Sequence, residues 1–202
     1  MLELLTGLGL ASASGLNAYV PLLALGLLGR FTDVVTLPAG WAWLENPWLL
    51  IVLGVLCVVD VVADKIPAVD SVNDVVQTLV RPASGGIVFA SGVGTETVAV
   101  SDPGAMFADG RWIPVVIGVV VALVVHLTKA GVRPVANVAT AGVSAPVLST
   151  VEDATSLSLV AAAILLPVLV LVLLGGVVGA GVVLLRRRRR SRAVARPRSA
   201  PR

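Results

Sequence analysis

Acidic, basic and amide side chains gather at a few places in a chain that is otherwise strongly apolar. Asp60 and Asp64 lie four residues apart. Two further series have steps of three or four residues, one with Asp70, Asp74, Gln77 and Arg81, and the other with His126, Lys129 and Arg133. Residues at these spacings share one face of a helix. Ionisable groups within or beside apolar segments are energetically costly, and they are usually paired and functional. The sequence therefore predicts a shared polar cavity formed by Asn17, Asp60, Asp64, Lys65, Asp70, Asp74, Gln77, Arg81, His126, Lys129, Arg133, Glu152 and Asp153.

The residue types in this set point to anion binding and proton transfer. Lys129 and Arg133 would engage an anionic group, and the carboxylates and His126 would carry protons, because imidazole titrates near neutral pH in water. The same charges permit a structural interpretation, in which the acids and bases only neutralise one another and hold the helices together. In that case the bases Lys65, Arg81, Lys129 and Arg133 would neutralise Asp64, Asp70 and Asp74.

Sequence patterns typical of enzymes and metal sites do not occur. The sequence contains no HExxH, CxxC or EF-hand spacing, no GxSxG motif and no phosphate-binding loop. The single cysteine, Cys57, lies in an apolar run, which is typical of a small buried residue. We therefore expect that the protein is not an enzyme and that it binds no cofactor and no metal ion. A less favoured alternative is a site in which several of the acids and the one histidine hold a divalent cation.

The composition predicts a membrane protein. The chain is 57% hydrophobic and 13% charged, whereas a soluble domain has about 25% charged residues. A bilayer core needs about 20 apolar residues in a helix. Together these features predict an all-α fold, a polytopic transmembrane helical bundle of about five spans, within a range of about four to six. The five main apolar segments cover about residues 2–29, 48–64, 84–100, 113–130 and 157–185.

Several segments have the composition of broken or re-entrant helices. Ser12, Ser14, Gly15 and Asn17 are small or polar residues in the middle of the first apolar segment, and Pro21 follows them. Such a cluster permits close packing and frees backbone groups for binding, so we expect a helix break beside the cavity. Bends are also expected inside the last segment, at Pro167 and at the following glycine pair. Residues 65–83 and 131–155 are too polar to span alone.

The C-terminal tail differs sharply in charge from the rest of the chain. Directly after the last apolar segment come five arginines, Arg186, Arg187, Arg188, Arg189 and Arg190. By the positive-inside rule they place the C-terminus in the cytoplasm, in a multi-pass protein of the inner or plasma membrane. We expect residues 1–185 to form a membrane-embedded helical domain, and 186–202 a basic, disordered tail that binds anionic lipids. The excess of basic charge is confined to this tail, so nucleic-acid binding is not expected.

Four stretches of sequence resemble a known family. They are GLNAYVPLLALGL (15–27), DVVADKIPAVDSVNDVVQTLVRPASGG (60–86), HLTKAGVRP (126–134) and LSTVEDATSLSL (148–159). Their order is similar to that of the domain-of-unknown-function 4126 family of bacterial integral membrane proteins, over roughly residues 5–175. The resemblance implies a membrane location and no established activity. It also implies shared polar positions at Asp64, Lys65, Asp70, Gln77, Thr78, Arg81, His126, Lys129, Arg133, Ser149, Glu152 and Asp153.

The chain departs from this family pattern at two positions. Many members carry Arg where this chain has Asn17, and Glu where it has Asp60. If that Arg and Glu form a pair in the family, the pair is lost here.

These features favour a small transporter, or a flippase for a lipid or solute, with a buried charged cavity. Its substrate would be a small anion or a lipid. The alternative is a non-transporting membrane scaffold or accessory subunit, in which the charged residues are structural salt bridges and the arginine tail serves for docking.

Overall fold

Helices account for nearly all of the described residues of this computed structural model, and none of those residues lies in a strand. The structure describes residues 2–93, 112–140, 144–172, 175–176 and 179. The chain divides into two units, Met1–Val170 and Leu171–Arg202. Because the described residues are almost all helical, the predicted all-α fold is confirmed.

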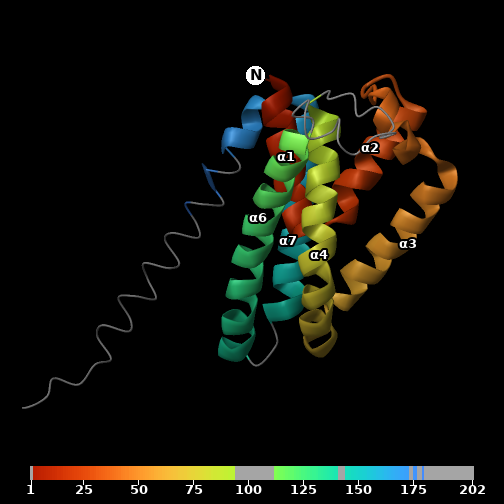
Figure 1. Cartoon of the computed structure of the whole chain (residues 1–202). Helices are drawn as coiled ribbons and strands as arrows, with labels where there is room; N and C mark the ends of the chain where they lie inside the picture. Colours follow the sequence, from red (N-terminus) through yellow and green to blue (C-terminus); the bar gives the residue numbers. More distant parts are fainter. Residues whose placement is uncertain (1, 94–111, 141–143, 173–174, 177–178, 180–202) are drawn as a thin grey trace, which may run out of the picture. The chain divides into compact units, whose positions relative to one another are not determined.

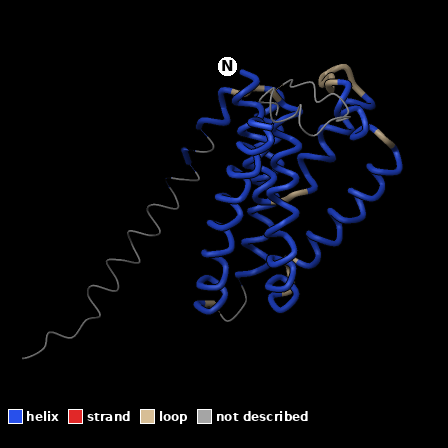
Figure 2. The backbone as a smooth tube through the Cα atoms, viewed as in Figure 1, coloured by secondary structure: helices blue, strands red, loops and turns tan. Residues whose placement is uncertain are grey.

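The first unit contains six α-helices among its described residues, and one 3-10 helix (Figures 1 and 2). Local sequence explains where several of them begin. Pro47 opens α3, and the side chain of Asn46 accepts hydrogen bonds from the backbone N–H groups of Trp48 and Leu49, as an N-cap does. The elements are α1 (Leu2–Leu16), α2 (Tyr19–Phe31), η1 (Ala39–Glu45), α3 (Pro47–Ala63), α4 (Pro67–Gly92), α6 (Trp112–Ala139) and α7 (Ser144–Leu165).

The first apolar segment, 2–29, forms a helical hairpin with its turn at Asn17 and Ala18. At the start of α1, the Thr6 hydroxyl donates to the carbonyl of Ala163, near the end of α7. At its end, Asn17 reaches Asp153, which lies earlier in α7. α2 then returns alongside the start of α3, as Figure 1 shows. Gly26 of α2 packs against Leu44 of η1 and Leu50 of α3.

The hairpin therefore turns within the bundle. α1 has 15 residues and α2 has 13, so they extend about 22 and 20 Å. Each is shorter than a bilayer core of about 30 Å. The break that the small and polar residues predicted is present, but the two halves do not continue in one direction as a single span.

Helices α3, α4, α6 and α7 run in alternating directions. The end of α3 meets the first half of α4, where Asn73 bonds to Asp60 and Asp64. α4 and α6 are antiparallel, because Thr78 lies beside His126 while Gly85 lies beside the earlier residue Gly118. α7 returns along the bundle, so that it ends near the start of α1.

The predicted boundaries around α4 and α7 are corrected by the structure. Residues 67–92 form one helix that continues through Pro82, whereas polarity suggested a separate element ahead of an apolar segment at 84–100. α7 begins at Ser144 and includes the polar stretch before residue 157. The helix is interrupted at Leu166 and Pro167, which confirms the bend predicted there. Both polar stretches can be helical within the bundle because Gln77 and Arg81 of the first, and Arg133 and Glu152 of the second, have polar partners there.

Two described helices are long and apolar enough to cross a membrane, Trp112–Arg133 and Ala145–Leu165. A third span results if η1 and α3, which bend by 62° at their junction, are counted together. The surface agrees with this assignment, because Val124 of α6 is 58% exposed and Leu157 of α7 is 60% exposed. Extensive exposed apolar surface is typical of contact with lipid or a partner. The predicted number of about five spans is not confirmed.

Close contact between α4 and α6 depends on glycine. A Cβ atom built on Gly118 would clash with the carbonyl oxygen of Gly85 and would lie 2.5 Å from the Cβ of Phe89. We expect Gly118→Ala to push the helices apart and to destabilise the protein by about 1–3 kcal/mol. Thermal unfolding of the detergent-solubilised protein measures this. The control is Gly54→Ala in α3, where a Cβ meets nothing within 4 Å. Equal effects of the two substitutions would contradict the observed packing.

Candidate functional site

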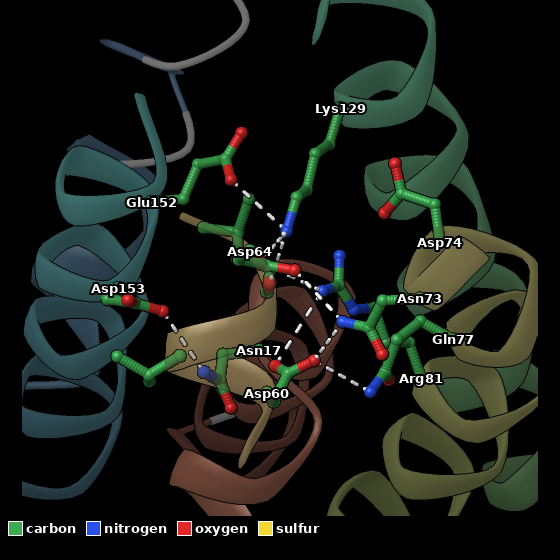
Figure 3. A network of polar contacts seen from close by, with 12 residues as sticks. Asn17, Asp60, Asp64, Asn73, Asp74, Gln77, Arg81, Lys129, Glu152 and Asp153 are labelled. Atoms are coloured by element: carbon green, nitrogen blue, oxygen red, sulfur yellow. Dashed lines mark hydrogen bonds and ion pairs between the residues drawn. The ribbon is translucent and has the colours of Figure 1, made fainter. Parts of the chain in front are cut away.

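Three buried cations from two helices converge on one carboxylate. Asp64, which caps the end of α3, is 1% exposed. Its Oδ2 atom lies 3.0 Å from Lys129 Nζ, 3.2 Å from Arg133 Nη2 and 3.6 Å from Arg81 Nη2. The three cations, hereafter the basic trio, are each no more than 5% exposed. Of the acids in 60–81, Asp64 thus contacts Lys129 and Arg133 of the stretch 126–133, and Figure 3 shows Asp64 beside Lys129.

Glu152 of α7 is the second carboxylate on the basic trio. It lies 3.1 Å from Lys129 Nζ. Arg133 donates to both of its oxygens through Nε, at 3.1 and 3.3 Å, and makes a further close contact through Nη2. An arginine that meets a carboxylate through two nitrogens is held in a defined orientation as well as attracted by charge. The Arg133–Glu152 pair therefore links α6 to α7.

Asp60 lies one turn before Asp64 and is bound mainly by amides. Its Oδ1 atom accepts hydrogen bonds from Asn73 Nδ2 at 2.6 Å and from Gln77 Nε2 at 2.8 Å. The Asn73 amide also donates to Asp64 Oδ1 at 3.0 Å and so bridges the two carboxylates. Arg81 Nη2 lies 3.8 Å from Asp60 Oδ2, beyond hydrogen-bonding distance.

His126 is fully buried and is held in one tautomer. The Thr78 hydroxyl donates to the carbonyl of Asp74, so it accepts from His126 Nε2 at 3.0 Å. Arg81 Nη1 lies 3.4 Å from His126 Nδ1, and an arginine can only donate. His126 therefore carries its proton on Nε2 and accepts at Nδ1. A second proton would place two donors against each other, so His126 is neutral in this arrangement.

The turn of the hairpin lies against the same cluster. Asn17 Oδ1 accepts hydrogen bonds from the backbone N–H groups of Tyr19 and Val20 in the first turn of α2, and its Nδ2 donates to Asp153 at 3.0 Å. Lys129 Nζ donates to the backbone carbonyl of Leu16, at the C-terminal end of α1, at 3.2 Å. A cation at that end of a helix interacts favourably with the helix dipole. Asn17, one of the predicted site residues, thus lies against the polar cluster.

The remaining predicted residues lie at the edge of the cluster or outside the description. Lys65 Nζ lies 3.9 Å from Asp153 Oδ2, and the Lys65 side chain is 39% exposed. Asp74 is half-buried and has no ion-pair partner among the described side chains. The backbone of Asp70 belongs to α4, but its side chain is not among those described.

The arginines predicted to bind the membrane surface also fall beyond the part of the chain that the structure describes. They are Arg186, Arg187, Arg188, Arg189 and Arg190. Their role at the membrane surface therefore stays a prediction from the sequence.

Sequence reasoning missed several neutral residues of the site. Asn73 and Ser84 lie four residues before and seven residues after Gln77, on the same face of α4. Ser84 donates to the carbonyl of Ala18 in the hairpin turn at 2.6 Å. On α7, Ser156 donates to the carbonyl of Ala13 at 3.1 Å. Extending the spacing rule from charged to neutral polar side chains finds Asn73 and Ser84.

The side chains of the cluster can offer donors to an anion more readily than ligands to a metal. Among the described residues, no three His, Cys, Asp or Glu side chains are placed to hold a metal ion. The basic trio instead offers many N–H donors in surroundings shielded from water, where electrostatic interactions are strong.

Comparison with known proteins places the chain in a family. Searches of curated proteins and of solved structures each returned no match. The sequence profile described as "Domain of unknown function (DUF4126)" matches residues 4–187 of the 202 residues, a range that includes the whole polar cluster. The resemblance noted in the sequence is thereby confirmed, and the chain belongs to the DUF4126 family.

Proposed function

We propose that this protein is a small membrane transporter, or a flippase, that moves an anionic solute or lipid headgroup past the basic trio. The single observation that carries the proposal is the convergence of Arg81, Lys129 and Arg133 in a buried cluster between apolar helices. Burying three cations costs several kcal/mol per ion before pairing. A charge set of this kind inside a membrane bundle commonly marks a substrate or ion pathway.

In this proposal α3, α4, α6 and α7 cross the membrane, and α1 and α2 form a re-entrant hairpin. Transporters often bind substrates where discontinuous helices end near the middle of the bilayer. Here the end of α1 and the start of α2 lie beside the basic trio, at Leu16 and Asn17. The hairpin is thus the element that would close one side of the pathway.

The chain's own carboxylates neutralise the basic trio in the observed state. Asp64 and Glu152 occupy the positions where a substrate anion would meet Lys129 and Arg133. We therefore assign this conformation to a closed state. The Arg133–Glu152 pair links α6 to α7, so opening between these two helices requires this pair to separate.

The same pairing supports the second candidate, a scaffold or accessory subunit that moves no solute. Every cation of the basic trio has a carboxylate of the chain within 4 Å, as a purely structural network requires. The tail at Arg186 to Arg190 would then dock on anionic lipids or on a partner. We retain the cytoplasmic position of the tail, in the inner or plasma membrane, as part of either proposal.

Flux through proteoliposomes of defined composition separates the two candidates. The probes are radiolabelled acetate, lactate and phosphate for solutes, and a fluorescent phosphatidylglycerol with dithionite quenching for lipid movement. The test variant is Arg133→Gln with Glu152→Gln, which removes one buried ion pair without changing the net charge. We expect flux to fall at least about tenfold, because residue 133 no longer makes a charged hydrogen bond to the substrate anion, and such a bond contributes about 1.5–3 kcal/mol.

The matched control is Arg30→Gln with Glu45→Gln. These residues make the same two charge changes at an exposed contact, where Arg30 Nη1 donates to the Glu45 carbonyl, outside the polar cluster. Flux equal to that of the wild type in both double variants, at equal protein content in the vesicles, would refute a role for the basic trio. Absence of movement of every probe by the wild-type protein would favour the scaffold.

A further inference from the structure

Asp60 and Asp64 lie one helical turn apart but have very different partners. Both oxygens of Asp64 accept hydrogen bonds, Oδ1 from Asn73 and Oδ2 from Lys129 and Arg133. Asp60 is equally buried, at 2% exposure. Its Oδ1 atom has two amide donors, but its Oδ2 atom has no hydrogen-bond partner among the described residues. Asp64 is thus a fixed counter-ion, whereas Asp60 has an oxygen at which a proton displaces no hydrogen bond.

Arg81 faces that oxygen with unused donors. Its side chain is fully buried, and its Nε and Nη2 atoms have no hydrogen-bond partner among the described residues. Nη2 lies 3.8 Å from Asp60 Oδ2. Nε and one Nη form the planar edge of a guanidinium group, which matches the two oxygens of a carboxylate. Buried polar atoms that lack partners are uncommon and often belong to a functional site.

The charge balance of the cluster limits what this edge can bind. The basic trio carries three positive charges, and the carboxylates paired with it are Asp60, Asp64 and Glu152. The cluster is neutral when all six groups are ionised. An added anion would be uncompensated in surroundings of low polarity, at a cost of several kcal/mol per ion. A proton that neutralises Asp60 at the same time restores the balance.

We propose that Arg81 and Asp60 form a binding site for a small monocarboxylate, which binds together with one proton. The Asp60 carboxylate takes up the proton on Oδ2 and becomes a carboxylic acid. Arg81 then pairs through Nε and Nη2 with the carboxylate of the ligand, and the Asp60 O–H group is a further donor to it. Release reverses both steps, so that one proton leaves with each anion. This inference rests on the proposed transport function and names its substrate class and coupling.

The other groups around Asp60 are poorer proton carriers. His126 accepts from Arg81 and donates to Thr78. Protonation of Asp64 or Glu152 would weaken direct hydrogen bonds to Lys129 and Arg133. The charged or titratable groups that face Asp60 are Tyr19 of α2, Cys57 of α3, Asp64 at the end of α3, Arg81 of α4 and Lys129 of α6.

Binding of sodium lactate and sodium acetate to the full-length protein in detergent tests this proposal without requiring transport. Isothermal titration at several pH values gives the affinity, and a pH dye in weakly buffered solution gives the protons taken up. For the wild type, we expect uptake of about one proton per bound anion, and affinity that falls about tenfold per pH unit once Asp60 is ionised.

Asp60→Asn supplies the decisive comparison. This substitution leaves the three cations with only two paired carboxylates, so an added anion restores the charge balance. We expect the variant to bind the anion at every pH and to take up no proton. Asp60→Asn combined with Arg81→Gln restores the charge balance and removes the guanidinium edge, so it should not bind at all. The double variant has equal numbers of buried cations and carboxylates. Its folding therefore shows whether the protein tolerates asparagine at position 60 without a charge imbalance.

Each outcome gives a decision. Proton uptake that persists in Asp60→Asn, or binding that persists in the double variant, would overturn the site. Absence of binding by the wild type, while vesicles still transport phosphate or lipid, would overturn the substrate class but leave the proposed transport function intact. Proton-linked binding without flux would confirm the site and refute transport.

Discussion

Replacement of Asp64 by asparagine is expected to destabilise the folded protein by about 3–5 kcal/mol, the cost of breaking a buried ion pair from one side. Asp64 is the common partner of Lys129, Arg133 and Arg81, at 3.0, 3.2 and 3.6 Å. An amide in its place removes the charge that all three share, and it adds a donor that faces other donors. The temperature at which the purified protein loses its monodisperse state in detergent measures the change.

The control for this experiment is Asp74→Asn. Asp74 is half-buried and makes no ion pair with a described side chain, so we expect a change within about 0.5 kcal/mol. If Asp64→Asn proves as mild as Asp74→Asn, the basic trio does not depend on Asp64 for its charge balance. The closed state described above would then be wrong.

Lys129→Met is expected to produce the second large effect, again about 3–5 kcal/mol. Lys129 Nζ holds Asp64 at 3.0 Å, Glu152 at 3.1 Å and the carbonyl of Leu16 at 3.2 Å. Methionine has a similar shape, so the loss reports the charge and its hydrogen bonds more than the packing. The same thermal measurement applies. Hydrogen exchange of the backbone around residues 16–20 should also become faster, because the hairpin turn loses its contact with α6.

A second substitution separates charge imbalance from lost contacts. Adding Glu152→Gln to Lys129→Met restores the equal number of buried cations and carboxylates. We expect the double variant to recover at least about 1 kcal/mol relative to the single one, as coupled neighbours in one network do. An additive or larger loss in the double variant would mean that Lys129 and Glu152 do not stabilise each other.

The sequence was sufficient to predict the helical fold class and most members of the polar cluster. Steps of three and four residues in 60–81 and 126–133 placed the charges on single helix faces. The cost of unpaired charge in apolar surroundings then required that the faces meet. Asp64, Arg81, Lys129 and Arg133 do meet, and both of these arguments depend only on local spacing and on general energetics.

The path of the first segment was not predictable in the same way. The residues Ser12 to Asn17 indicate a break, but a break is compatible with a helix that continues and with one that reverses. The reversal depends on contacts distant in sequence, such as those of Asn17 with Asp153 and of Ser84 with the Ala18 carbonyl. Likewise, α4 is continuous because its polar residues find partners on α3 and α6. A prediction from hydropathy alone divides α4 into a polar element and a separate apolar segment.

The hairpin has a consequence for how the proposed membrane arrangement can vary. A segment that returns to the face from which it entered adds no net crossing, so its presence does not alter the direction of α3, α4, α6 and α7. Lengthening, shortening or exchanging residues 2–31 therefore leaves the inside-outside polarity of everything downstream unchanged. An insertion of one more full crossing at the same place would invert it. In the proposed arrangement, changes to the two arms of the hairpin would leave the orientation of the other helices the same, whereas the turn at Leu16 to Ala18 is held by Lys129, Asp153 and Ser84.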